Sequence, residues 1–439
     1  MNTSSNARLK KGEGLSLKIG LIPDGWHRYK LYELMEITSS KRIFFSEYIS
    51  AGIPFYRSKE VIEKFNNKSV STELFISKER FEDIKQKFGV PQRGDILLTS
   101  VGTLGVPFLI EDDTDFYFKD GNLTWFLNFK RDSILSEYLY YWLASNTGRQ
   151  KLLDSSIGST QQALTIAGLK NIEIDVPSCE EQHSIAKTLH CIDGKIKLNH
   201  RMNETLEGVA LVLFKRWFVD FEFPDAKGRP YRSYGGKMVS SELGPVPAGW
   251  RVVPLTEMVD VLGGGTPSTG VSSYWDGEIP FFTPKDASEA SYVTRTEKTV
   301  TQEGLTHCNS PQFPHGTVFI TARGTVGKVC MAGVPMAMNQ SCYALKGKEL
   351  RQLYVFFLIK DIAQKLIQQS HGTVFETITT QTFQRTMAIR PEADVVNLFC
   401  TKVECLYAQI LNNINESASL GTIRDSILPR MMSGKMTVS

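Results

Sequence analysis

Residues 94–105 read GDILLTSVGTLG, and residues 316–327 read GTVFITARGTVG. Both stretches place a short apolar run before a Gly-Thr-x-Gly segment, with the glycines and threonines in register. An apolar run that ends in closely spaced glycines predicts a strand, a tight turn and a second strand. The recurrence of the whole pattern decides the fold, because it marks the same place in two equivalent domains.

Further matches extend this internal repeat. The sequence IPDGW at 22–26 returns as VPAGW at 246–250, and GIPFYRSKE at 52–60 returns as EIPFFTPKD at 278–286. At 439 residues the chain has room for two domains of about 100–200 residues each. We therefore expect each half to contain one copy of a domain rich in βαβ elements.

The segments that follow Pro177 and Pro391 have a different pattern. Seam residues recur there at alternating steps of four and three, and a heptad seam sustained over about four heptads predicts a long helix that packs as a coiled coil. Asn199 and Asn413 occupy matching central positions, so we expect them to fix the register of an inter-helix pair. Two surface helices, each packed on its own domain, remain the alternative. The seam positions are Ile185, Leu189, Ile192, Ile196, Asn199, Asn203, Leu206, Ala210 and Leu213, and then Phe399, Val403, Leu406, Ile410, Asn413, Ser417, Leu420, Arg424 and Ile427.

The order of these segments predicts the fold class. The chain runs domain, helix, domain, helix, so two helices that pair must pair antiparallel. We predict an α+β fold with two repeated β-rich domains, which also contain helices, separated by a pair of long antiparallel coiled-coil helices. The predicted parts are a tail at 1–20, a first domain at 21–178, a first helix at 179–222, a linker at 223–243, a second domain at 244–392 and a second helix at 393–439.

Composition and charge limit the possible functions. Lys and Arg exceed Asp and Glu by a net charge of only +3, so the positive charge of any polyanion site must be local. The seven cysteines form no Cys-x-x-Cys pair, which is typical of reduced thiols and argues against structural zinc. No signal peptide and no apolar run of about 20 residues is present, so we expect a cytoplasmic protein without a membrane span.

Known catalytic motifs are missing from the sequence. The stretch GTVGKV at 324–329 lacks the leading glycine and the final hydroxyl of a phosphate-binding loop, and GGGTP at 263–267 does not fit a dinucleotide fingerprint. The histidines have no metal-ligand spacing, and no Asn/Asp-Pro-Pro-aromatic loop of a base-methylating enzyme occurs. The sequence therefore favours a binding protein over an enzyme, with a single-chain nuclease or methyltransferase disfavoured.

Taken together, the motifs resemble the specificity subunits of type I restriction–modification systems over nearly the whole chain. The resemblance rests on the two Pro-x-Gly-Trp openings, on GGTPS at 264–268 followed by YWDGEIPF at 274–281, and on the repeated Gly-Thr-x-Gly elements. It also rests on EEQ at 180–182 before the first helix and on FKRWFVDFEF at 214–223 after it. The first domain departs from the pattern, with TSSKR at 38–42 in place of GGTPS.

The resemblance implies a DNA-binding function without catalysis in this chain. Two target-recognition domains would each read one half of a bipartite, asymmetric sequence in double-stranded DNA, and the helices would set the gap. The helices would also dock two DNA methyltransferase (M) subunits, and restriction/translocase (R) subunits would complete the assembly. This chain would bind no cofactor, whereas its partner subunits would use S-adenosylmethionine, ATP and magnesium.

Loop residues with donors and acceptors are the candidates for DNA contact, because Arg or Lys can grip guanine and Gln or Asn can grip adenine. Lys59 and Lys285 recur in register, which favours phosphate contacts, whereas Arg57 against Thr283 differs as base-reading positions should. A solvated side chain remains the alternative for each candidate. The candidates are Ser40, Lys41, Arg42, Tyr56, Arg57, Lys59, Ser100, Thr103, Gln161 and Gln162 in the first domain, and Ser268, Thr269, Thr283, Lys285, Arg323, Thr325, Thr373 and Glu376 in the second.

Two alternatives stay open at this point. The chain could be a scaffold or decoy subunit whose helices bind methyltransferase while its recognition domains do not bind DNA. The glycines of the repeated turn could serve close approach to DNA, although a tight turn is the favoured interpretation.

The helix pattern makes a testable prediction about the gap between half-sites. Inserting one heptad near Asn199 and a matching heptad near Asn413 lengthens each helix by about 10 Å, at about 1.5 Å per residue. The recognised gap should therefore lengthen by about three base pairs, with both half-site sequences unchanged. A methylation map of cells that carry the variant measures the gap. Gly-Ser insertion in the 223–243 linker is the control and should leave the gap unchanged. An unchanged gap after the paired heptad insertion would contradict the prediction.

Overall fold

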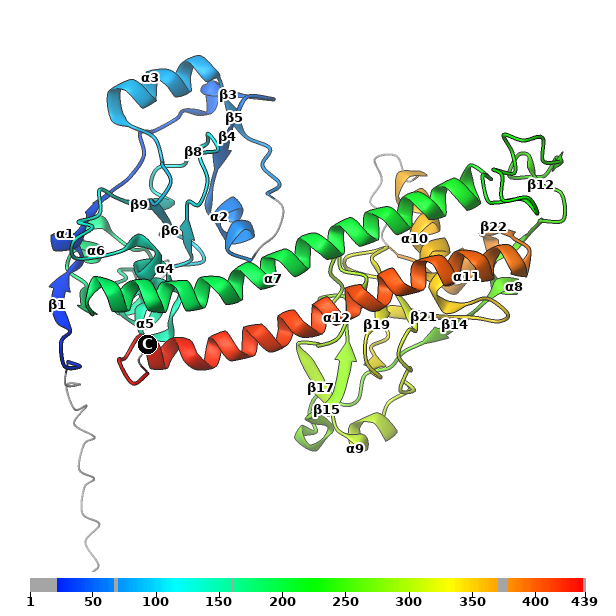
Figure 1. Cartoon of the computed structure of the whole chain (residues 1–439). Helices are drawn as coiled ribbons and strands as arrows, with labels where there is room; N and C mark the ends of the chain where they lie inside the picture. The colour runs from blue at the N-terminus through cyan, green and yellow to red at the C-terminus, as the bar shows by residue number, and fades with distance from the viewer. Residues whose placement is uncertain (1–21, 67–69, 159–161, 370–376, 437–439) are drawn as a thin grey trace, which may run out of the picture. The chain divides into compact units, whose positions relative to one another are not determined.

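The computed structural model describes residues 22–66, 70–158, 162–369 and 377–436. The chain forms two compact units, Met1–Gly194 with Gly421–Ser439, and Lys195–Leu420. The first domain lies in the first of these units and the second domain in the other. Figure 1 shows the two long helices, α7 (Cys179–Phe214) and α12 (Ala393–Met431), each as one continuous element that has residues in both units. The predicted tail at 1–20 lies outside the described residues.

The described part of the first domain contains small sheets with strand orders β1-β10, β2-β9-β6-β7 and β3-β5-β4-β8. Short helices accompany these sheets. The strands are β1 (His27–Lys30), β2 (Glu36–Thr38), β3 (Tyr48–Ile49), β4 (Ile53–Tyr56), β5 (Phe75–Ile76), β6 (Ile96–Thr99), β7 (Pro107–Leu109), β8 (Tyr117–Phe118), β9 (Leu123–Leu127) and β10 (Glu173–Val176). The helices are α1 (Leu31–Leu34), α2 (Ser58–Phe65), α3 (Lys78–Phe88), α4 (Ser136–Ala144), α5 (Asn146–Asp154) and α6 (Ile166–Lys170).

The second domain has sheets with orders β13-β22, β14-β21-β18-β19-β16 and β17-β15-β20, and a small pair β11-β12 precedes them. The strands are β11 (Met238–Val239), β12 (Val246–Pro247), β13 (Arg251–Pro254), β14 (Val259–Gly263), β15 (Trp275–Phe282), β16 (Tyr292–Val293), β17 (Lys298–Val300), β18 (Val318–Thr321), β19 (Val329–Ala332), β20 (Ala337–Met338), β21 (Cys342–Gly347) and β22 (Met387–Arg390). The helices are α8 (Leu255–Met258), α9 (Gln302–Thr306), α10 (Gln352–Gln369) and α11 (Thr380–Arg385).

Strand pairing confirms the repeat but corrects its expected content. The predicted strand, turn and strand form in both domains, where β6 pairs with β7 and β18 with β19, both antiparallel. The expectation of domains rich in βαβ elements is wrong, because most pairs are antiparallel. Among the described strands, the parallel pairs are β4 with β8, β15 with β20 and β16 with β19. The chain between β4 and β8 contributes other strands as well as helices, so this connection is not a simple helical crossover.

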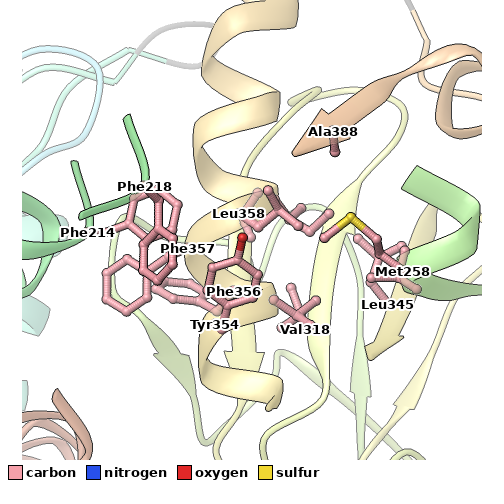
Figure 2. Close-up of a cluster of buried hydrophobic side chains, with 14 of the residues drawn as sticks. Phe214, Phe218, Met258, Val318, Leu345, Tyr354, Phe356, Phe357, Leu358 and Ala388 are labelled. Atoms are coloured by element: carbon pink, nitrogen blue, oxygen red, sulfur yellow. The ribbon is translucent and has the colours of Figure 1, made fainter. Parts of the chain in front are cut away.

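The core of the second unit is rich in aromatic side chains. Figure 2 shows Phe214 and Phe218, from the end of α7 and the π-helical turn that follows it (Lys215–Val219), beside Tyr354 and Phe357 of α10. The Phe214 and Phe357 rings stack with centroids 5.4 Å apart, and Phe218 meets Tyr354 edge-on at 4.9 Å. These apolar contacts anchor the C-terminal end of α7 on the second domain.

The predicted linker is a folded segment. Phe223 is buried and stacks on Trp250 at 5.0 Å on one side and on Tyr231 at 4.6 Å on the other. Trp250, the tryptophan of the second Pro-x-Gly-Trp motif, therefore packs against the segment that follows α7. Burial of these aromatic rings keeps the segment ordered despite its proline and glycine content.

The two long helices begin at the predicted positions. The Ser178 hydroxyl accepts a hydrogen bond from the Glu181 backbone N–H at 3.3 Å, which satisfies one free donor at the start of α7. Glu181 Oε1 is buried without a hydrogen bond to any described residue.

The helices pair through a polar layer in the second unit, as the seam predicted. Asn199 is fully buried and donates through Nδ2 to Glu416 Oε2 at 2.8 Å and to Ser417 Oγ at 3.3 Å. Asn413 donates through Nδ2 to Asn203 Oδ1 at 2.8 Å. Partner numbers on α12 fall as numbers on α7 rise, so the helices run antiparallel within this unit. The inter-helix pair is confirmed, and surface helices that each pack only on their own domain are excluded.

The first unit contains its own contact between the helices. Arg424 Nη1 of α12 donates to Asp193 Oδ1 of α7 at 2.8 Å, and both side chains are largely shielded from solvent. A half-buried, charge-assisted hydrogen bond is directional and disfavours a slipped pairing. Both predicted seams therefore contain polar contacts that specify register.

Asn413→Ala tests the polar layer by stability. The change leaves Asn203 Oδ1 without its donor and the Gln409 side chain without its 2.7 Å acceptor, so we expect a loss of about 1–3 kcal/mol in the free energy of unfolding. Denaturant unfolding of the full chain measures this difference. Asn412→Ala is the matched control, because Asn412 is an exposed neighbour on the same helix. Equal stability of the two variants would contradict the assigned role.

Candidate nucleic-acid interface

Four loops of the second domain are held side by side by its strand pairing. Parallel pairing of β15 with β20 ends in a hydrogen bond from Asn339 N to Phe282 O at 3.0 Å. The Ala322 N–H donates to Ser341 O at 2.9 Å, and Gly265 N donates to Met338 O at 3.0 Å. We call these loops, 264–269, 283–286, 322–327 and 339–341, the second loop surface.

The first domain repeats this framework with different side chains. Parallel pairing of β4 with β8 ends in a hydrogen bond from Lys119 N to Tyr56 O at 2.9 Å, and Ser100 N donates to Asn122 O at 2.8 Å. Loops 38–42, 57–60, 100–105 and 119–122 form the equivalent first loop surface. Two of the three backbone bonds have an equivalent in the first domain. The third, from Gly265 N to Met338 O, is replaced there by a bond from the Ser40 hydroxyl to Phe118 O, and the residues carried by the loops differ.

The repeated Gly-Thr-x-Gly segments are tight turns. In the first domain Thr99 Oγ1 donates to Thr103 O at 2.5 Å, and Thr321 donates in the same way to Thr325 O. Gly324 and Gly327 have φ values of 79° and 86°, in the left-handed region that favours glycine. A Cβ on Gly327 would lie 2.6 Å from Ile367 Cδ1. The favoured interpretation of these glycines as turn residues is confirmed.

Several predicted residues present exposed side chains on or beside the two surfaces. Lys41 Nζ lies 4.5 Å from the centre of the Phe88 ring, and Arg42 Nε donates to Asp120 Oδ2 at 2.9 Å. Arg323 has no hydrogen bond or ion pair with any described residue, while Thr325 Oγ1 donates to Pro284 O at 3.2 Å and ties two loops together. The exposed candidates are Lys41, Arg42, Lys59, Thr103, Gln162, Ser268, Thr269, Lys285, Arg323 and Thr325.

The two lysines that recur in register make loose ion pairs, and Lys59 Nζ also donates to Ser71 O at 3.3 Å. Lys59 Nζ lies 3.9 Å from Glu63 Oε1, and Lys285 Nζ lies 3.8 Å from Glu297 Oε2 with 80% of the lysine side chain exposed. Exposed pairs of this length contribute little to stability, so both ammonium groups can be redirected to another anion. Their assignment as phosphate contacts stays a prediction.

Three predicted residues are buried inside the first domain. Ser40 Oγ donates to Phe118 O at 2.8 Å, and the buried Ser100 hydroxyl bonds with Thr124 Oγ1 at 2.6 Å. Tyr56 is buried and stacks on Phe116 at 4.5 Å, and burial raises the pKa of its phenol. These side chains hold the loops in place, and base contact by any of them would require the local structure to open.

Arg57 and Thr283 occupy equivalent turns that are closed by an acidic residue. Arg57 N donates to Glu60 Oε2 at 2.7 Å, and its guanidinium donates to Glu60 Oε1 at 2.9 Å. The hydrogen bond to Glu60, a fully buried carboxylate, raises the pKa of Arg57. Thr283 donates through its N–H at 2.8 Å and through its hydroxyl at 2.7 Å to Asp286 Oδ2. Both residues therefore have a turn-stabilising role in the structure.

Three predicted contacts fall outside the described residues, namely Gln161, Thr373 and Glu376. Sequence reasoning also missed the loops after β8 and β20. The structure adds exposed Lys119 and Gln340, together with Asp120 and Asn339, to the loop surfaces. The two loops differ in length and have no identical residues at equivalent positions, so the internal repeat did not reveal that they correspond.

The described residues also contain no group of three or more His, Cys, Asp or Glu side chains that could hold a metal ion. No helix in the described part of the chain is long and apolar enough to cross a membrane.

Comparison with known proteins agrees with the resemblance noted in the sequence. A type I restriction enzyme HindI specificity subunit from Haemophilus influenzae is 24% identical over an alignment that covers 94% of this chain and 99% of that protein. A type I restriction enzyme MjaIX specificity subunit from Methanocaldococcus jannaschii is 25% identical over an alignment that covers 96% of this chain and 95% of that protein.

A solved structure has the same fold. The crystal structure of a type I restriction-modification system S subunit from M. genitalium superimposes with a TM-score of 0.54 at 16% identity, over 92% of this chain and 96% of that one. The family model described as type I restriction modification DNA specificity domain matches residues 23–208 and 247–390, one match in each half. With two such matches that cover most of its length, the chain belongs to the type I restriction modification DNA specificity family.

Proposed function

We propose that this chain is the DNA-specificity subunit of a type I restriction–modification complex. Each recognition domain reads one half of a bipartite, asymmetric DNA target through its loop surface, and the paired helices set the gap between the halves. The main support for this proposal is that the two loop surfaces share one backbone framework but present different side chains. A shared framework suits common positioning on DNA, and different side chains suit two different half-sites.

Partners and cofactors follow from the same proposal. The helices dock two DNA methyltransferase (M) subunits, and restriction/translocase (R) subunits join the assembly. S-adenosylmethionine, ATP and magnesium are used by these partner subunits, and this chain binds none of them. We place the complex in the cytoplasm, where chromosomal and incoming DNA are accessible.

The scaffold or decoy alternative is distinguished by salt dependence. A DNA-binding chain neutralises phosphates, so its affinity for mixed-sequence duplex should fall steeply between two salt concentrations. A chain that serves only as a scaffold should not retain duplex at either concentration. The exposed Lys41, Lys59, Lys285 and Arg323 on the loop surfaces favour the first outcome.

Two single substitutions test the roles of exposed cations on the second loop surface. Arg323→Ala should relax selection at one half-site by about 1–3 kcal/mol, because a base contact discriminates between sequences. Lys285→Ala should weaken binding to all duplexes and reduce the salt slope by about 1, because a phosphate contact does not discriminate. Titration of the full chain against selected and scrambled duplexes at several salt concentrations measures both effects.

Lys346→Ala, which removes an exposed lysine on β21 away from the loop surfaces, is the control for loss of charge alone. Equal losses on selected and scrambled duplexes for Arg323→Ala would contradict its base-reading role. A loss of binding for Lys285→Ala that is confined to duplexes with one half-site sequence would contradict its phosphate role.

A further inference from the structure

The Gly264-Gly265-Thr266-Pro267 segment of the second domain packs directly on the loop that follows β20. A Cβ on Gly264 would lie 2.2 Å from Met338 O, and a Cβ on Gly265 would lie 2.6 Å from the backbone nitrogen of Asn309. Contacts this short are with backbone atoms, which cannot move aside as a side-chain end can. Gly264 is therefore required for the close approach to the loop after β20, and Gly265 for the close approach to Asn309.

This packing brings the hydroxyl of Thr266 to the side chain of Gln340. Thr266 Oγ1 and Gln340 Oε1 form a hydrogen bond between the two loops, and both residues are exposed. A glutamine oxygen has two acceptor sites, so one remains after Thr266 has donated. The Gln340 amide nitrogen donates to no described residue. Gln340 thus presents an acceptor and a donor side by side on a positioned side chain.

The chemistry of this pair matches one base. Adenine presents an N6 donor and an N7 acceptor in the major groove, and a glutamine amide can bond both at once. We propose that Gln340 reads an adenine in the half-site of the second domain, and that Thr266 is a positioning residue that orients the Gln340 amide. This assignment rests on the proposed function and identifies one base of the half-site that the second domain would read.

The equivalent place in the first domain has different chemistry. There Ser40 Oγ donates to Phe118 O at 2.8 Å, where Gly265 N donates to Met338 O in the second domain. Arg42 donates through Nε to Asp120 Oδ2 at 2.9 Å, and 69% of its side chain is exposed. A guanidinium oriented through Nε still presents its outer nitrogens, which suit the two acceptors of guanine. The contact between these two loops therefore presents Gln340, which suits adenine, in the second domain and Arg42, which suits guanine, in the first.

Selection from a random duplex pool by the full-length chain tests the assignment. The wild-type chain should enrich a second half-site with adenine at one position, and Gln340→Ala should lose about 5- to 150-fold of discrimination at that position alone. Thr266→Val should partially reduce the selection for adenine at the same position, whereas Thr266→Ser, which keeps the hydroxyl, should retain it. Gln302→Ala, at an exposed glutamine that begins α9, should leave the enriched sequence unchanged.

The first half-site serves as an internal folding control in the same selection, since a folded Gln340→Ala chain must still enrich it. An unchanged adenine preference in Gln340→Ala, or a wild-type second half-site with no adenine preference, would overturn the assignment while leaving the proposed function intact. Relaxation by Thr266→Ser equal to that of Thr266→Val would overturn the positioning role. Failure of the wild-type chain to enrich any bipartite sequence would overturn the proposed function as well.

Discussion

Parallel pairing of two short strands in each domain is the constraint on which both loop surfaces depend. In the second domain Phe282 of β15 pairs with Met338 of β20, and in the first Tyr56 of β4 pairs with Phe118 of β8. Parallel neighbours end at the same edge of a sheet, so the loops that follow them emerge together. The glycine turn then attaches by a backbone hydrogen bond in both domains, and the loop before β15 or β4 attaches through Gly265 N in the second domain and through the Ser40 hydroxyl in the first. Exposed loop side chains that take no part in these bonds can therefore differ between the domains.

The long helices have a separate constraint, which is the polar content of their seam. Asn199 and Asn413 lie in a buried layer where a one-residue slip would leave amide groups without partners. In the other unit the Arg424–Asp193 contact has the same effect with charged groups. Polar contacts therefore specify the register of the helix pair within each unit.

The sequence was sufficient for features with a local or periodic signal. The heptad seam predicted two long helices where α7 and α12 form, and the spaced glycines predicted the turns that follow β6 and β18. Tyr56 and Ser100 were predicted as loop contacts, but β4 runs through Tyr56, and Ser100 turns inward toward Thr124 directly after β6. Gln340 was missed because its role depends on a contact with Thr266, 74 residues earlier in the chain. Such a contact becomes visible only when strand pairing is known.

Sequencing the methylome of cells with and without the gene for this chain tests the central claim most directly. The account predicts that one bipartite motif, with two specific segments on either side of a gap of fixed length, is methylated only in cells that carry the gene. Two domains on one shared framework but with different loop side chains require the two segments to differ. A methylome that does not change with the gene, or a dependent motif without an interrupting gap, would contradict the account.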